Sequence, residues 1–207
     1  MNDRKLLARI VLASLCLAST VSAQSVCLPA PRLLTTMPMG GQAGTEVEIV
    51  ITGEAIEDIE QLLFSVPGIT ATPKPAADGK PEPNKFLVNI KADTLPGIHE
   101  ARVLSRLGMS TSRVFTVGRL PEVKQEQPST TVAAAMPLAM NSICNATLPV
   151  RAANHYSFQA TKGQRVIVDC AAKGIDSKMN HVLIIAETAG RDLVVERRGG
   201  ALDFTVP

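Results

Sequence analysis

Short runs of alternating apolar and polar residues, separated by glycine and proline turns, dominate this sequence. In one run Val47, Ile49 and Ile51 alternate with Glu46 and Glu48. A period of two places successive side chains on opposite faces of an extended strand. Similar runs lie at Lys85–Lys91, His99–Ser105, Arg113–Val117 and, more briefly, Gln61–Val66. Several short strands with regularly spaced turns are typical of an all-β sandwich. One stretch, 54–63, has an apolar spacing that favours a turn or two of helix.

The alternation stops near Val117 and resumes after Met136. Residues 121–131 are polar, are bounded by proline and have no hydrophobic period, so 119–136 is predicted to be an interdomain linker. The later strands are expected at Tyr156–Ala160, Gln164–Ala171, His181–Glu187, Asp192–Arg197 and Ala201–Val206. The sequence therefore predicts two β-sandwich modules, at 31–118 and 137–207.

The second module stops at Pro207 on an apolar strand. Five strands would leave an unpaired edge, which promotes aggregation. We expect this module to be partial, truncated at its C-terminus, and the chain to be a fragment. The alternative is a small complete domain with a blunt end.

The first 23 residues have the three parts of a secretory signal peptide. Arg4, Lys5 and Arg9 are followed by the apolar run 10–18 and then by small residues, which predicts cleavage between Ala23 and Gln24. The run is about half the ~20 residues that a membrane span needs. Lipid attachment at Cys16 is disfavoured because Leu15 precedes it. The mature product is expected to be secreted, periplasmic or at the cell surface, without a membrane span.

Removal of this segment leaves no net charge. The whole chain has 21 Lys and Arg and 19 Asp and Glu; the segment contains three basic residues and Asp3, which leaves 18 of each sign. A neutral protein has no electrostatic footprint for nucleic acid. The sequence also has no Trp and one Tyr, so it lacks an aromatic platform for stacking sugars or bases.

Three cysteines remain in the mature chain, in a setting that permits disulfides. Cys144 and Cys170 lie in the same predicted module, and a bond between them would close a loop of about 26 residues, worth roughly 3.5 kcal/mol. We therefore predict the disulfide Cys144–Cys170, the alternative being two buried free thiols. Cys27 is left over.

No catalytic, cofactor or metal site is predicted. His99, His155 and His181 lack the spacing of zinc ligands, although His155 and His181 could meet near Asp169 or Asp176. Residues 108–112 lack the final glycine of a nucleophile elbow around Ser110. Asp176 and Ser177 are expected to cap a turn. No phosphate-binding glycine motif is present, and Asn145 begins a single glycosylation sequon.

Two sets of segments resemble known families. Residues 31–45, followed by an alternating strand and Gly53, and later 96–103, 107–110 and 114–118, resemble the immunoglobulin-like IPT/TIG-type modules of large exported proteins in planctomycete-type bacteria. Residues 145–171 and 174–179, with the turn Lys162-Gly163-Gln164-Arg165, resemble the first half of a bacterial pre-peptidase C-terminal (PPC) domain, a jelly-roll-like sandwich. That family usually has Asp before its aromatic strand, where this chain has Asn154 and His155.

The resemblance implies an accessory role without an active site. We expect an exported, non-catalytic binding, adhesion or envelope-associated protein that presents loops to an extracellular protein or polysaccharide. The alternative is the N-terminal accessory region of a larger secreted hydrolase, in which these modules would contact other domains of the parent protein. A metal-dependent enzyme within these residues is a third and disfavoured hypothesis.

Overall fold

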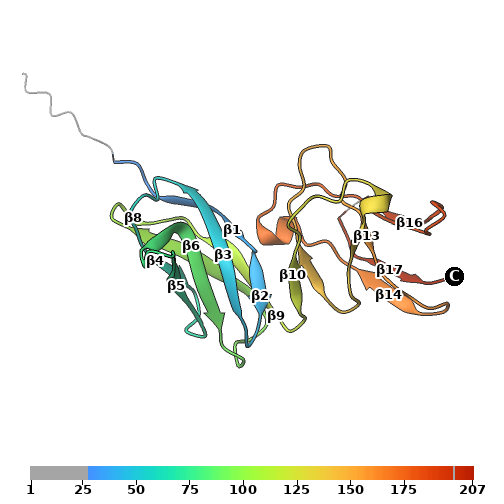
Figure 1. The fold of residues 1–207 in the computed structure, drawn as a ribbon, viewed down its shortest axis with the longest axis horizontal. Helices are drawn as coiled ribbons and strands as arrows, with labels where there is room; N and C mark the ends of the chain where they lie inside the picture. The colour runs from blue at the N-terminus through green and yellow to red at the C-terminus, as the bar shows by residue number, and fades with distance from the viewer. Residues whose placement is uncertain (1–27, 198) are drawn as a thin grey trace, which may run out of the picture.

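The computed structural model describes residues 28–197 and 199–207, and nearly all of its regular elements are β-strands. The exceptions in these residues are two single-turn 3₁₀ helices, η1 (Val132–Ala134) and η2 (Lys173–Ile175). The predicted all-β class is confirmed. Two units lie beside each other, the first containing β1–β9 and the second β10–β17 (Figure 1). Among the described residues, no helix has the length and apolarity needed to cross a membrane.

The first unit is a sandwich of two sheets. One sheet has the order β1–β3–β6–β5: Arg32–Met37, Glu46–Glu54, Pro81–Ile90 and Ile69–Pro75. The other has the order β2–β9–β7–β4: Gly40–Gln42, Arg113–Gly118, Gly97–Ser105 and Ile59–Phe64, with the short β8 (Gly108–Met109) on β7. The strands predicted in this half of the chain are all present, within a few residues at their ends.

Aliphatic side chains fill the space between these sheets. Ile49 and Ile51 of β3 are buried while Glu46 and Glu48 are exposed, as the alternation predicted. Phe115 is fully buried in the same cluster, and its ring meets that of Phe64 edge to face at 4.9 Å between centroids. Each such burial stabilises the fold by roughly 1.5–3 kcal/mol.

The chain changes sheets between β1 and β2. β1 pairs antiparallel with β3, whereas β2 pairs parallel with β9, Gly40 lying opposite Thr116. A Cβ atom at Gly40 would overlap both the side chain and the carbonyl of Thr116. Glycine at this position therefore permits the close approach of the two backbones.

The helical turns expected at 54–63 are absent, so that prediction was wrong. Ala55 and Asp58 have φ of 52° and 58°, which a right-handed helix does not allow. The chain turns there and enters β4, which pairs antiparallel with β7. Ile56 and Leu62 are buried in the sandwich core, so the apolar spacing reflects a turn followed by a strand.

Strand β5 has no counterpart among the alternating runs, because Pro73 and Pro75 interrupt it. It is the last strand of its sheet and pairs only with β6 there. Proline lacks an N–H and is tolerated at such an edge.

The second unit consists of four two-stranded sheets. Two are parallel: β10 (Glu122–Lys124) with β12 (Ile143–Asn145), and β11 (Met136–Pro137) with β13 (Tyr156–Ser157). Two are antiparallel: β14 (Arg165–Val168) with β17 (Leu202–Thr205), and β15 (Leu183–Ala186) with β16 (Asp192–Glu196). On β14 Val166 is buried and Ile167 exposed, as expected for neighbouring residues of the strand predicted at Gln164–Ala171.

Residues 119–136, predicted to be a linker, contain ordered structure. β10 pairs with β12, and the side chains of Gln125 and Ser129 are buried. Thr131 caps η1 by accepting a hydrogen bond from the Ala134 N–H. This segment therefore forms part of the second unit's framework, although its sequence is polar.

Candidate functional site

A buried amide organises a polar cluster in the second unit. Just beyond β10, the Gln125 N–H donates to the Asn145 carbonyl at 2.8 Å, which continues the ladder of β10 with β12. The Gln125 side chain donates to Ser129 Oγ at 2.9 Å. Its Oε1 accepts from Asn154 Nδ2 at 2.9 Å and from the Tyr156 hydroxyl at 3.0 Å. We call Gln125, Ser129, Asn154 and Tyr156 the amide cluster.

Asn154 directly precedes His155 and β13, and its side-chain amide contacts two acceptors. Its Nδ2 donates both to Gln125 and to the Thr147 carbonyl, the latter at 3.2 Å. Its Oδ1 is buried and has no hydrogen-bond partner. A carboxylate cannot donate, so the amide suits the two acceptors that surround this position.

Tyr156 is the member of the amide cluster that lies near the two cysteines. The pKa of Tyr156 is raised to about 12, mainly by burial and to a lesser extent by the nearby Cys144 and Cys170, while the hydrogen bond with Asn154 acts to lower it. Burial also raises the pKa of Cys144, which a hydrogen bond with Tyr156 opposes. Burial and then Asp169 raise the pKa of Cys170. All three groups keep their protons at neutral pH, which does not favour nucleophilic chemistry.

Cys144 and Cys170 are both half-buried and both free thiols in the structure. The Cys144–Cys170 disulfide therefore stays a prediction. Their common proximity to Tyr156 places the two thiols in one region of the second unit. The predicted cleavage site at Ala23 and Gln24, and the leftover Cys27, lie outside the described residues.

Glu122 and Asn145 form a neighbouring polar pair across β10 and β12. Asn145 Nδ2 donates to Glu122 Oε2 at 2.7 Å. Burial raises the pKa of Glu122, and this hydrogen bond lowers it. The amide nitrogen of the sequon is thus engaged in a contact within the fold.

The three histidines occupy separate places. His99 Nε2 lies 3.0 Å from the Leu95 carbonyl in the first unit. His155 donates its backbone N–H to the Ser129 carbonyl at 2.7 Å, and His181 Nε2 is buried without a hydrogen-bond partner. Within the described ranges, no three or more His, Cys, Asp or Glu side chains gather into a group that could hold a metal ion.

Ser110 has a structural role in the first unit. Its side chain is buried, its Oγ accepts from the Val103 N–H at 2.9 Å, and it donates to the Thr111 carbonyl at 2.8 Å. The Ser110 hydroxyl therefore serves as the hydrogen-bond acceptor for a backbone N–H of β7, next to the short strand β8.

The prediction that Asp176 and Ser177 cap a turn is confirmed only for Ser177. Ser177 Oγ accepts from the Met179 N–H at 3.2 Å, which caps the local turn. Asp176 Oδ2 instead accepts from the backbone N–H of Val114 in the first unit, at 2.9 Å. Spacing in the sequence gives no signal for a contact across 62 positions.

A hollow of about 320 Å³ opens at one end of the first unit. Hydrogen bonds fix the loops around it: Gly68 O accepts from the Lys91 N–H at 2.9 Å and from Thr94 Oγ1 at 3.1 Å. We call it the loop hollow; its lining is Val66, Pro67, Gly68, Lys91, Asp93, Thr94, Leu95 and His99. Leu95 is 75% exposed and Ile98, on the following strand, is 65% exposed. A smaller hollow of about 210 Å³ lies over β4 and β7.

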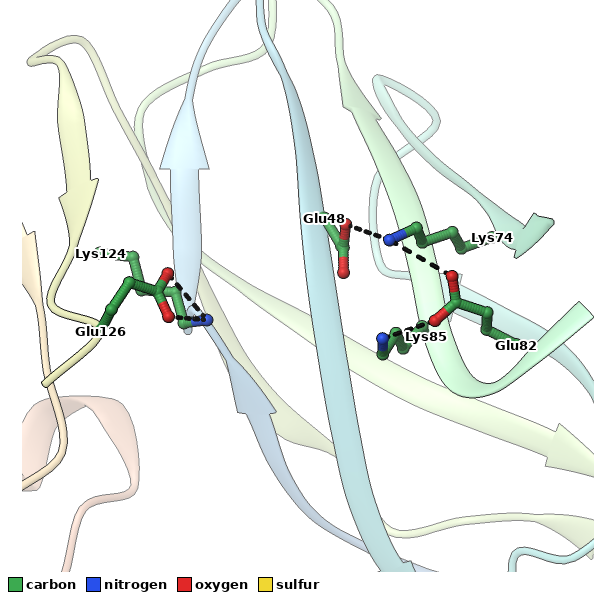
Figure 2. A network of polar contacts seen from close by, with 6 residues as sticks. All are labelled: Glu48, Lys74, Glu82, Lys85, Lys124 and Glu126. Carbon is green, nitrogen blue, oxygen red and sulfur yellow. Dashed lines mark hydrogen bonds and ion pairs between the residues drawn. The ribbon is translucent and has the colours of Figure 1, made fainter. Parts of the chain in front are cut away.

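Ion pairs cover the outer face of the β1–β3–β6–β5 sheet of the first unit. Lys74 of β5 contacts Glu48 of β3 at 2.8 Å and Glu82 of β6 at 3.4 Å, and Lys85 also pairs with Glu82 (Figure 2). The hydrogen bond with Glu48 raises the pKa of Lys74, and the one from Lys85 lowers the pKa of Glu82. A further pair, Lys124–Glu126, belongs to the second unit. Such solvated pairs join strands and contribute little stability.

Comparisons with known proteins do not assign the chain to a family. No family model matches it, and no curated protein matches it. One solved structure with a detectable likeness is SGBP-B of a Bacteroides ovatus mixed-linkage glucan utilization locus, in complex with a mixed-linkage heptasaccharide. The likeness covers 82% of this chain with a TM-score of 0.30 and 10% sequence identity. This chain spans about a third of that protein, 34%. A likeness at this level supports no functional argument.

Proposed function

We propose that this chain is a non-catalytic binding protein of the cell exterior, whose loop hollow contacts an extracellular protein. In this proposal residues 31–118 act as an IPT/TIG-like module and the second unit acts as a PPC-type module. The observation that carries the proposal is the loop hollow, a concave surface on the end of a rigid sandwich.

The chemistry of the loop hollow favours a protein partner. The exposed side chain of Leu95 lies beside Lys91 and Asp93, so an apolar anchor is bordered by charges of both signs. Protein interfaces combine apolar anchors with a polar rim in this way. Among the side chains that line the hollow, none is Trp, Tyr or Phe, which gives sugars no ring on which to stack.

The loops around the hollow are held in place before any partner binds. The hydrogen bonds of Gly68 with Lys91 and Thr94 join the β4–β5 turn to the β6–β7 loop, and His99 holds the Leu95 carbonyl. A preformed surface loses less conformational entropy on binding.

Binding of the labelled mature chain, residues 24–207, to intact cells of its source tests the proposal. Leu95→Asp and Ile98→Asp should each weaken binding about tenfold or more, as expected for interface anchors. Val132→Asp is the matched control, because Val132 is 70% exposed but lies in η1 of the second unit. Protease treatment of the cells should abolish binding, and periodate oxidation of their glycans should not. Wild-type binding by Leu95→Asp and Ile98→Asp would refute the proposed surface, and sensitivity to periodate alone would indicate a polysaccharide.

A further inference from the structure

We infer that Asp176 fastens the second unit to an open edge of β9, and so fixes the orientation of the two units. This inference concerns the assembly of the chain and is independent of what the loop hollow binds. Asp176 Oδ2 accepts a hydrogen bond from the Val114 N–H at 2.9 Å.

The register of β9 shows why Val114 needs a partner. Along a strand, alternate N–H groups point to the same edge. The Thr116 N–H donates to the Met39 carbonyl on the β2 side, so the N–H of Val114, two residues earlier, faces that side too. β2 begins with Gly40 opposite Thr116, and no residue of β2 is paired with Val114. The Asp176 carboxylate occupies the position that a longer β2 would fill.

The local fold around η2 holds Asp176 in place. Ala172 is buried, and its carbonyl accepts from the N–H groups of Ile175 and Ser177, each at 3.0 Å. Asp176 then adopts the left-handed conformation, with φ of 63°, as the C-cap residue of η2. Asp tolerates this conformation better than most residues. The turn thus directs the carboxylate away from the second unit and toward β9.

A second close approach between the units lies at the other end of β9. A Cβ atom placed on Gly118 would be 3.6 Å from Cδ1 of Ile143, which is on β12 of the second unit. Gly118 and Val114 are four residues apart, or about 13 Å along a strand. A single point of approach would allow one unit to rotate against the other, whereas two points at this separation define an orientation. Figure 1 shows the short orange helix η2 between the two units.

Amide hydrogen exchange in the full mature chain, measured by NMR, tests the hydrogen bond. In Asp176→Ala, exchange at Val114 should become about tenfold faster or more, because its N–H loses its acceptor. Exchange at Phe115 and Val117, whose N–H groups face β7, should not change. Asp176→Asn keeps an acceptor oxygen and should preserve most of the protection. Asp192→Ala, on β16, is the matched control for loss of an exposed carboxylate.

Residual dipolar couplings on the same samples test the orientation. Wild type and Asp176→Asn should fit one common alignment for both units, whereas Asp176→Ala should require two. Unchanged exchange at Val114 in Asp176→Ala would overturn the inference. Faster exchange with a single unchanged alignment would also overturn it, because Asp176 would then cap an edge without fixing the units.

Discussion

At the scale of single residues, Asn154 shows how one amide adapts a site to its surroundings. Its Nδ2 serves two acceptors, Gln125 Oε1 and the Thr147 carbonyl. Asn154→Asp would place a carboxylate opposite these two acceptor oxygens and would remove the N–H groups that donate to them. Loss of such partners in a half-buried place costs about 2 kcal/mol. We expect chemical denaturation to show a free energy of unfolding lower by about that amount, and Asn180→Asp, at an exposed position, to change it by less than about 0.5 kcal/mol. Equal effects of the two substitutions would contradict the role given to Asn154.

Tyr156 is the one tyrosine of a chain without tryptophan, so its ionisation can be followed directly by ultraviolet absorbance. Burial raises its pKa to about 12, from an ordinary value near 10. The folded state therefore holds this proton more tightly than the unfolded state. Its contribution to stability is complete below about pH 10 and is lost as the pH rises through 12. Because the side chain is 38% exposed, we expect about 1–2 kcal/mol after allowance for solvent screening. An absorbance midpoint near pH 10 in folded protein would contradict this account.

The amide cluster could not be predicted from the sequence, for a physical reason. Gln125 and Ser129 lie in a polar stretch, and nothing local distinguishes a solvated Gln from a buried one. Their burial depends on Asn154 and Tyr156, about thirty positions later. The pairing of Cys144 with Cys170 is a prediction from spacing and compartment, whereas the surroundings of both thiols depend on the same distant contacts.

At the scale of elements, alternation located β3, β4, β6, β7 and β9 of the first unit but missed β5 and the turn at 55–58. The alternation in β3 was sufficient to predict a strand, because burial on one face requires apolar residues at every second position. The segment 54–63 was mistaken for helix because Ile56, Ile59 and Leu63 repeat at helical intervals. Only the positive φ of Ala55 and Asp58, set by the tertiary turn, excludes that structure.

Gly40 provides a test of how β2 is attached. Gly40→Ala would drive a methyl group into the Thr116 backbone, which cannot move without disturbing β9. Overpacking of this kind typically costs 1–3 kcal/mol, and we expect thermal unfolding to show a loss in the upper part of that range. Gly174→Ala is the control, because an added Cβ there meets no atom within 4 Å. If both variants unfold at the wild-type temperature, the close approach of β2 and β9 is incorrect.

At the scale of the whole molecule, the two units have unequal cores. The cluster between the sheets of the first unit contains thirteen buried hydrophobic residues. Among the described residues of the second unit, the buried hydrophobic residues are Val166, Ala172 and Leu202. The second unit should therefore unfold first. Tyr156 absorbance reports on that unit alone, so its urea midpoint should lie below the main loss of far-ultraviolet circular dichroism, which reports on both units. Coincident transitions would show instead that the units unfold together.

The predicted Cys144–Cys170 disulfide would reduce the difference in stability between the two units. If it forms, it closes a loop of about 26 residues and adds roughly 3.5 kcal/mol, all of it to the second unit. A reductant should then lower the urea midpoint of Tyr156 absorbance and leave the first unit's transition in place. The double variant Cys144→Ser, Cys170→Ser should resemble the reduced protein and should not respond to reductant. Separate, unlinked Cys144 and Cys170 peptides in a non-reduced digest, with a midpoint that reductant does not change, would instead identify both as permanent thiols. The second unit would then depend on the amide cluster and on its contacts with β9 to remain folded.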